Sequence, residues 1–170
     1  ENVSLAFSIP RVIDGDGVLA EVFDYRDNYL AYACADRWHK SYVVAGDTEV
    51  REALAVANCI PNVSATVFRR PPPELLAPCQ GYRCSGDWLF YLLMAKRGMV
   101  AYVHGDLALH RRHEASVVAR DHREKQLLLR QEMEQIHGLA QMHFGPLPPE
   151  TVTRMQRFLA SLEAKPSEQA

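Results

Sequence analysis

One segment, from Ser85 to His104, constrains the fold of this chain more than any other. Ser85 can cap a helix that runs from about Gly86 to Arg97, and Gly98 stops that helix at the C′ position, where glycine is favoured. The apolar run from Met99 to His104 then has the composition of a strand. The segment therefore predicts a helix and a strand in immediate succession.

The rest of the chain continues this alternation. Apolar and β-branched runs predict four more strands, at residues 3–8, 18–23, 63–69 and 107–110. Helical spacing of apolar residues predicts three more helices, at 49–58, 116–143 and 151–164. Residues 24–47 are expected to form a loop with one or two helical turns. This order of elements predicts an α/β layered core followed by a helical C-terminal extension.

Length, charge and cysteine usage exclude several classes of protein. The 170 residues suit one domain or one large piece of one, and the net charge of −2 gives no reason to expect a nucleic-acid partner. No apolar run approaches the roughly 18 residues of a membrane span. The four cysteines fit no common zinc spacing, so we interpret them as reduced thiols and expect a cytoplasmic protein.

The segment Asp14-Gly-Asp16-Gly17 has two interpretations. Asp and Gly between apolar runs are typical of a hairpin turn. The two aspartates also have the Asp-x-Asp spacing of a metal site. The turn is the favoured interpretation, because the pattern follows directly after the first strand.

Four stretches in order carry a family resemblance. They are an apolar strand that ends in Phe68-Arg-Arg70, the acidic motif Ser85-Gly-Asp-Trp88, the strand Gly98-Met-Val-Ala-Tyr-Val103, and the segment Leu107-Ala-Leu-His-Arg-Arg-His-Glu-Ala-Ser116. Together they resemble the second half of family-two glycosyltransferases of the GT-A fold. The resemblance covers roughly residues 58–120 and is looser over residues 1–57.

The resemblance implies a partial GT-A-like mixed sheet flanked by helices. Residues 1–115 would be the acceptor-side part of the domain, 116–164 a helical extension, and 165–170 a disordered tail. The family's N-terminal nucleotide-binding half, which carries its Asp-x-Asp motif, would be missing and would be the main partner of this chain. Because the chain begins at Glu1 within an expected strand, we expect it to be part of a longer protein.

The implied activity is that of an inverting, nucleotide-sugar-dependent hexosyltransferase in bacterial surface polysaccharide synthesis. It would act in the cytoplasm or at the inner face of the membrane, and the isolated chain would be inactive. The family's Mg²⁺ or Mn²⁺ would bind together with the nucleotide-sugar, so none is expected to bind this fragment tightly. The alternative is a non-catalytic carbohydrate-binding or assembly module of a larger protein. A small hydrolase with paired carboxylates is less favoured, since no second acid lies near Asp87 in the sequence.

Asp87 matches the aspartate of the family's acidic motif and is the candidate catalytic base. A base must be ionised to take a proton from the acceptor hydroxyl. The dipole at the start of the helix favours the ionised form, whereas burial beside Trp88 and Phe90 would raise the pKa. The sequence leaves this balance open, and Asp87 can also serve only to complement the helix start.

The segment from Arg111 to Ser116 matches the part of the family that contacts the donor diphosphate. Arg111 and Arg112 offer planar forks for phosphate oxygens, and His113 can bind a metal or donate a hydrogen bond. Ser116 can cap the next helix, whose first N–H groups favour an anion. The alternative is a solvated basic turn.

The candidate acceptor contacts are Trp38, Asn62 and Trp88. Trp38 stands among charged loop residues and can stack on a sugar or anchor the loop over the core. The apolar residues around Trp88 spread round their helix, which is typical of a buried helix, with sugar stacking as the alternative. Asn62 can bind the acceptor or form a turn.

The long helix expected at 116–143 has several potential partners. Its apolar stripe can pack on its own domain, on the missing half, or on a second copy to form a homodimer. Its mixed polar face gives no support for binding to a membrane surface. Packing within the chain is the favoured interpretation.

Overall fold

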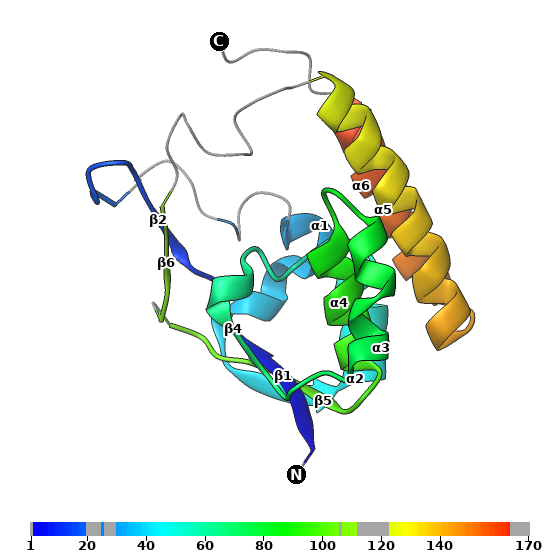
Figure 1. The fold of residues 1–170 in the computed structure, drawn as a ribbon, viewed down its shortest axis with the longest axis horizontal. Helices are drawn as coiled ribbons and strands as arrows, with labels where there is room; N and C mark the ends of the chain where they lie inside the picture. The colour runs from blue at the N-terminus through cyan, green and yellow to red at the C-terminus, as the bar shows by residue number, and fades with distance from the viewer. Residues whose placement is uncertain (1, 20–24, 26–29, 106, 112–122, 164–170) are drawn as a thin grey trace.

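The computed structural model describes residues 2–19, 25, 30–105, 107–111 and 123–163, and its centre is a mixed sheet (Figure 1). The sheet has four strands in the order β3-β5-β1-β4, namely β1 (Val3–Phe7), β3 (Tyr42–Ala45), β4 (Thr66–Phe68) and β5 (Met99–Tyr102). β5 is parallel to β1, while β3 and β4 run antiparallel to β5 and β1. The predicted α/β class with a mixed sheet is confirmed.

A second sheet consists of β2 (Arg11–Ile13) and β6 (Leu109–Arg111), which pair in parallel. The turn after β2 is held by Asp14, whose carboxylate accepts hydrogen bonds from the backbone N–H groups of Asp16 and Val18 at 2.9 and 2.8 Å. Gly17 has a φ of 88°, a conformation that favours glycine. The turn interpretation of this segment is therefore confirmed.

Helices cover the sheet and extend beyond it, as Figure 1 shows. The larger ones are α4 (Gly86–Ala95), α5 (Arg123–Phe144) and α6 (Pro149–Glu163). The shorter ones are α1 (Leu30–Cys34), α2 (Gly46–Glu49), α3 (Pro73–Leu76), the π-helical turn η2 (Val50–Leu54), and the 3₁₀ turns η1 (Ala35–His39), η3 (Val63–Ala65) and η4 (Pro78–Gly81).

Residues 24–47 differ from the prediction of a loop with a few helical turns. The helical turns are present as α1 and η1, but β3 was missed. This strand has only four residues and lies at an edge of the sheet, where its side chains alternate between exposed and half-buried. The run Tyr42–Ala45 is apolar and contains two β-branched valines, so the sequence carried a signal for this strand that the prediction passed over.

Two glycines allow close approach of neighbouring backbones. Gly46 brings α2 close to the end of α4, and Gly98 brings the residue before β5 close to the residue before β1. A Cβ atom on Gly46 would lie 1.8 Å from the carbonyl oxygen of Ala95, and one on Gly98 would lie 2.3 Å from that of Asn2. Among the described glycines, positive φ occurs at Gly17, Gly105 and Gly145. The expected C′ role of Gly98 is therefore wrong, and this glycine instead makes room for a neighbouring backbone.

The C-terminal helices share one hydrophobic core with the sheet. Met133, Ile136 and Ala140 of α5 and Met155 and Phe158 of α6 are buried in the same cluster as Leu5 and Trp88. The favoured interpretation of the long helix, packing within the chain, is confirmed. Among the described residues, none of the helices is both long and apolar enough to cross a membrane.

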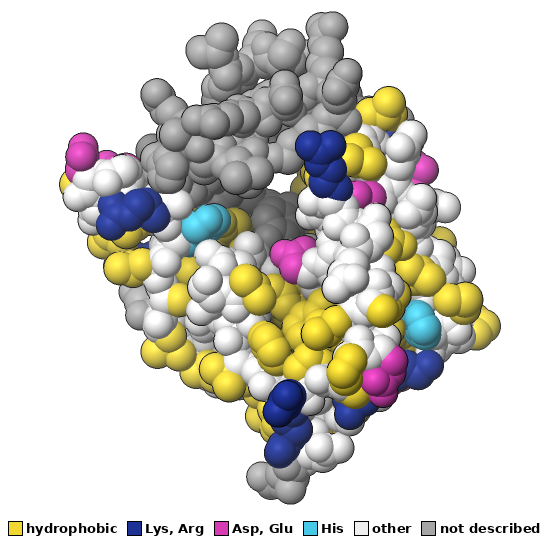
Figure 2. Space-filling view, in the orientation of Figure 1, with side chains coloured by type: hydrophobic (Ala, Val, Ile, Leu, Met, Phe, Trp, Pro, Cys, Tyr) yellow, Lys and Arg dark blue, Asp and Glu magenta, His cyan; other side chains and the backbone are white. Residues whose placement is uncertain are grey.

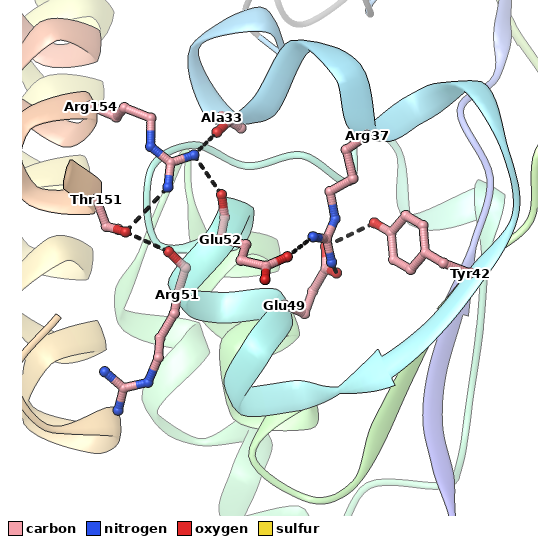
Figure 3. A network of polar contacts seen from close by, with 8 residues as sticks. All are labelled: Ala33, Arg37, Tyr42, Glu49, Arg51, Glu52, Thr151 and Arg154. Carbon is pink, nitrogen blue, oxygen red and sulfur yellow. Dashed lines mark hydrogen bonds and ion pairs between the residues drawn. The ribbon is translucent and has the colours of Figure 1, made fainter. Parts of the chain in front are cut away.

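A polar network holds α6 and η1 against η2 (Figure 3). Arg154 donates to the carbonyl oxygens of Ala33 and Glu52, and Thr151 donates to that of Arg51 at 2.7 Å. Arg37 forms ion pairs with Glu49 and Glu52. Because Glu49 is almost fully buried, its ion pair with Arg37 is part of the interior rather than of an open site.

Candidate functional site

Asp87 lies in the first turn of α4 and is exposed to solvent. Its Oδ1 accepts a hydrogen bond of 2.7 Å from the backbone N–H of Trp88, and the side-chain amide of Asn58 donates to the same atom from 3.5 Å. The residue is open to solvent on one side, yet burial on the other raises the pKa of its carboxyl, and the hydrogen bonds oppose this rise. The sequence left open whether the helix dipole or burial dominates the pKa of Asp87, and in the structure burial dominates.

Tyr91, one turn further along α4, brings a second polar group to this region. Its side chain is buried, and its hydroxyl has no hydrogen-bond partner among the residues that the structure describes. Burial raises the pKa of Tyr91, and the nearby charge of Asp87 raises it further. The hydroxyl is therefore protonated at neutral pH and is a donor.

The start of α4 is capped by a residue from another helix. Glu132 of α5 is 5% exposed, and its carboxylate accepts hydrogen bonds from the backbone N–H groups of Arg83, Cys84 and Ser85 at 2.7, 2.9 and 2.8 Å. An anion is favoured at this end of a helix, where N–H groups have no partner within the helix.

The side chain of Ser85 does not cap α4 as expected. Its hydroxyl is buried and has no partner among the described residues, and the N–H of Trp88, which an N-cap side chain can bond, donates to Oδ1 of Asp87 instead. The sequence carried a signal for Glu132 that we missed. Glu132 lies on the helix face of Leu129, Met133 and Ile136, and an acid on an apolar face needs a buried partner.

A second contact fixes the same part of α4. The indole of Trp88 donates from Nε1 to the carbonyl oxygen of Leu54 at 2.7 Å, and the ring of His137 lies edge-on to it at 5.5 Å. Burial lowers the pKa of His137, so its imidazole is neutral at pH 7. Its Nε2 lies 3.2 Å from the carbonyl oxygen of Val56, a distance that suits an N–H donor at that atom. α5 thus holds both the backbone before Asp87 and the side chain after it.

Two of the expected acceptor contacts are wrong. Trp38 is 0% exposed and packs edge-on against the ring of Tyr102, with a centroid distance of 5.6 Å. Trp88 is 1% exposed. Neither ring has a free face for a sugar, and both tryptophans are core anchors, which was the alternative for each. The side-chain oxygen of Asn62 accepts from the N–H of Ser64 at 2.8 Å, so this residue forms a turn.

The expected diphosphate segment is only partly within the described residues. Arg111 ends β6, and its guanidinium donates to the carbonyl oxygens of Asp14 and Gly15 at 3.1 and 2.6 Å. This contact holds the β2 turn and does not direct the guanidinium at Asp87. Arg112, His113 and Ser116 lie outside the described residues.

The described residues do not offer a metal site. No three of their His, Cys, Asp and Glu side chains come together in a way that could hold an ion. The carboxylate of Asp14 is occupied by backbone N–H groups of its own turn. The residues that the structure describes therefore offer no fitting ligands for the Mg²⁺ or Mn²⁺ that the resemblance implies, and the candidate ligand His113 lies outside them.

The structure thus brings together Asp87, Asn58 and Tyr91 at the start of α4, supported by Glu132 and His137 from α5. No protein-family model, curated protein or solved structure matches the chain.

Proposed function

We propose that this chain is the acceptor-side part of an inverting, nucleotide-sugar-dependent glycosyltransferase of the GT-A type, with Asp87 as the general base. The proposal rests on the family resemblance of residues 58–120 and on one structural observation. Asp87 combines solvent access with a raised carboxyl pKa and a fixed position at the start of a capped helix. A carboxylate of raised pKa is a better proton acceptor than an ordinary aspartate, and it must still be ionised to act.

The neighbouring groups have roles that follow from their chemistry. The amide of Asn58 holds Oδ1 of Asp87, which leaves Oδ2 free to accept the proton of an acceptor hydroxyl. The charge of Asp87 acts on the neutral, buried hydroxyl of Tyr91, which places this hydroxyl in the surroundings of the same carboxylate. The described residues thus supply the base and its orientation, and stabilisation of the leaving diphosphate would come from elsewhere in the full-length protein.

The test is Asp87→Asn in the full-length protein, with release of nucleoside diphosphate followed over a panel of nucleotide-sugars and acceptor sugars. We expect transfer to fall by about 10²–10⁴-fold while nucleotide-sugar binding stays nearly unchanged. Asp47→Asn, at an exposed carboxylate on α2, is the matched control and should transfer normally. Normal turnover by Asp87→Asn would remove Asp87 from the mechanism. Residues 1–170 alone should show no transfer.

A non-catalytic carbohydrate-binding module is the second candidate. One observation favours it: Asp87 lines neither of two hollows on the described surface, which lie at the other end of α4. If this function is correct, oligosaccharide should bind the chain with an affinity that Asp87→Asn leaves unchanged. The full-length protein should then lack transferase activity.

A further inference from the structure

A groove of about 520 Å³ lies between α3, α4 and α5, at the end of α4 remote from Asp87. Its walls include Leu89 and Leu93 of α4 and Leu139 of α5. Met142, which is 69% exposed, also lines the groove and extends its apolar surface. Figure 2 shows hydrophobic side chains gathered on this face of the molecule, with His, basic and acidic side chains adjoining them at the lower right. The volume is within the range of about 300–1,000 Å³ that is usual for small-molecule sites.

The groove has a polar end with a positive charge. Lys96 and Arg97 follow Leu93 by one turn of α4, and both line the groove. Their side chains are exposed and have no ion-pair partner within the described part of the chain. The same two residues also line a second hollow of about 590 Å³, so they stand on the ridge between the two.

The other titratable groups at the groove leave this positive charge in place. Burial and the charge of Lys96 lower the pKa of His143, so its imidazole is neutral at pH 7 and can donate a hydrogen bond. Glu74 is the acidic residue that lines the groove. Asp47, which lines the neighbouring hollow, already pairs with Arg51 at 2.7 Å.

We propose that this groove binds a single-chain anionic amphiphile, with its alkyl chain between α4 and α5 and its phosphate head at Lys96 and Arg97. Cations at the end of α4 also complement the negative end of the helix dipole, which accounts for their charge. That effect does not account for an open apolar groove that begins one turn away. An amphiphile satisfies both features, since its chain covers the leucines while its head meets two unpaired cations. The proposal is independent of the role of Asp87.

Titration of the chain with dodecyl phosphate below its micelle concentration tests this site. Dodecyl phosphate should bind with shifts of backbone amide NMR signals confined to the groove, while dodecyl maltoside and dodecyltrimethylammonium should bind at least about tenfold more weakly. Shortening the chain should weaken binding by about fourfold per methylene. Equal binding of the three head groups, or signal shifts away from the groove, would overturn the proposal.

Charge variants distinguish binding of the phosphate head group from non-specific hydrophobic binding. The double variant Lys96→Glu, Arg97→Glu should weaken dodecyl phosphate binding by about tenfold or more, and Glu74→Gln should strengthen it modestly. Lys40→Glu, at an exposed lysine after η1, is the control and should bind like the parent. All these positions are exposed, so the fold should persist and can be checked by circular dichroism. Unchanged binding by the double variant would refute the site.

Binding only to anionic vesicles, without dependence on monomer chain length, would assign the cations to a membrane surface instead.

Discussion

The carboxylate of Glu132 on α5 accepts a hydrogen bond of 2.8 Å from the backbone N–H of Ser85, 47 positions earlier in the chain. Through this contact and the hydrogen bonds from the N–H groups of Arg83 and Cys84, α5 orders the turn that precedes Asp87. The position of Asp87 is therefore determined by a residue that does not touch it.

Removal of the Glu132 carboxylate should lower the stability of the fold. Glu132→Ala leaves one buried and two part-buried N–H groups without an acceptor, and we expect the free energy of unfolding to fall by about 3 kcal/mol. Urea denaturation followed by circular dichroism measures the change. Glu134→Ala, which removes an exposed ion pair with Arg130 on the same helix, should change stability by less than about 1 kcal/mol. Equal effects of the two variants would contradict the assignment of Glu132 as a cap.

The titration of Asp87 provides a test that needs no substrate. Its carboxyl ¹³C signal should titrate above the ordinary value of 3.8. Asn58→Ala removes a hydrogen bond that lowers this pKa, so the value should rise further. Asn62→Ala, whose side chain bonds within its own turn, should leave it unchanged. A midpoint below 3.8 in the parent chain would show that the helix dipole prevails over burial.

The buried imidazole of His137 should make stability depend on pH. Its pKa in the folded state lies below the ordinary value of 6.5, so below that pH the unfolded chain takes up a proton that the folded chain does not. The free energy of unfolding should therefore fall between pH 7.5 and 5.5, by at most about 1.4 kcal/mol per pH unit for this group. In His137→Gln the slope should be smaller, as measured by urea midpoints across this range. A slope identical to that of the parent would place the dependence on other groups.

Two glycines make a matched pair for testing the close approach of α2 to α4. Gly46→Ala would place a Cβ 1.8 Å from the carbonyl oxygen of Ala95, so we expect a loss of about 3 kcal/mol or more. A Cβ on Gly138, within α5, meets nothing within 4 Å. Gly138→Ala should therefore raise stability by about 0.5–1 kcal/mol, because alanine favours the helix. Thermal unfolding of the two variants decides the point.

Local patterns predicted the parts of the fold that depend on near neighbours. The helix that begins at Gly86 and the strand after Gly98 lie where the apolar runs placed them, although Ser85 and Gly98 do not have the capping roles that were expected. The turn at Asp14 was also predictable, since it is closed by bonds within four residues.

Features that depend on distant neighbours could not be predicted in the same way. Trp38 lies among charged residues in the sequence, but η1 turns its ring into a cluster with Phe7 and Tyr102, from β1 and β5. Likewise, only the packing of α5 on α4 reveals that Glu132 bonds the backbone N–H groups that lead into α4. The family resemblance singled out Asp87 as a candidate, and tertiary contacts supply its surroundings.

The cap that α5 provides has a consequence for the order of assembly during translation. The ribosome releases the segment around Asp87 well before it releases Glu132 and His137, so that segment emerges with three backbone donors still facing water. The turn before Asp87 thus reaches its final geometry only once α5 has been synthesised and has packed against α4.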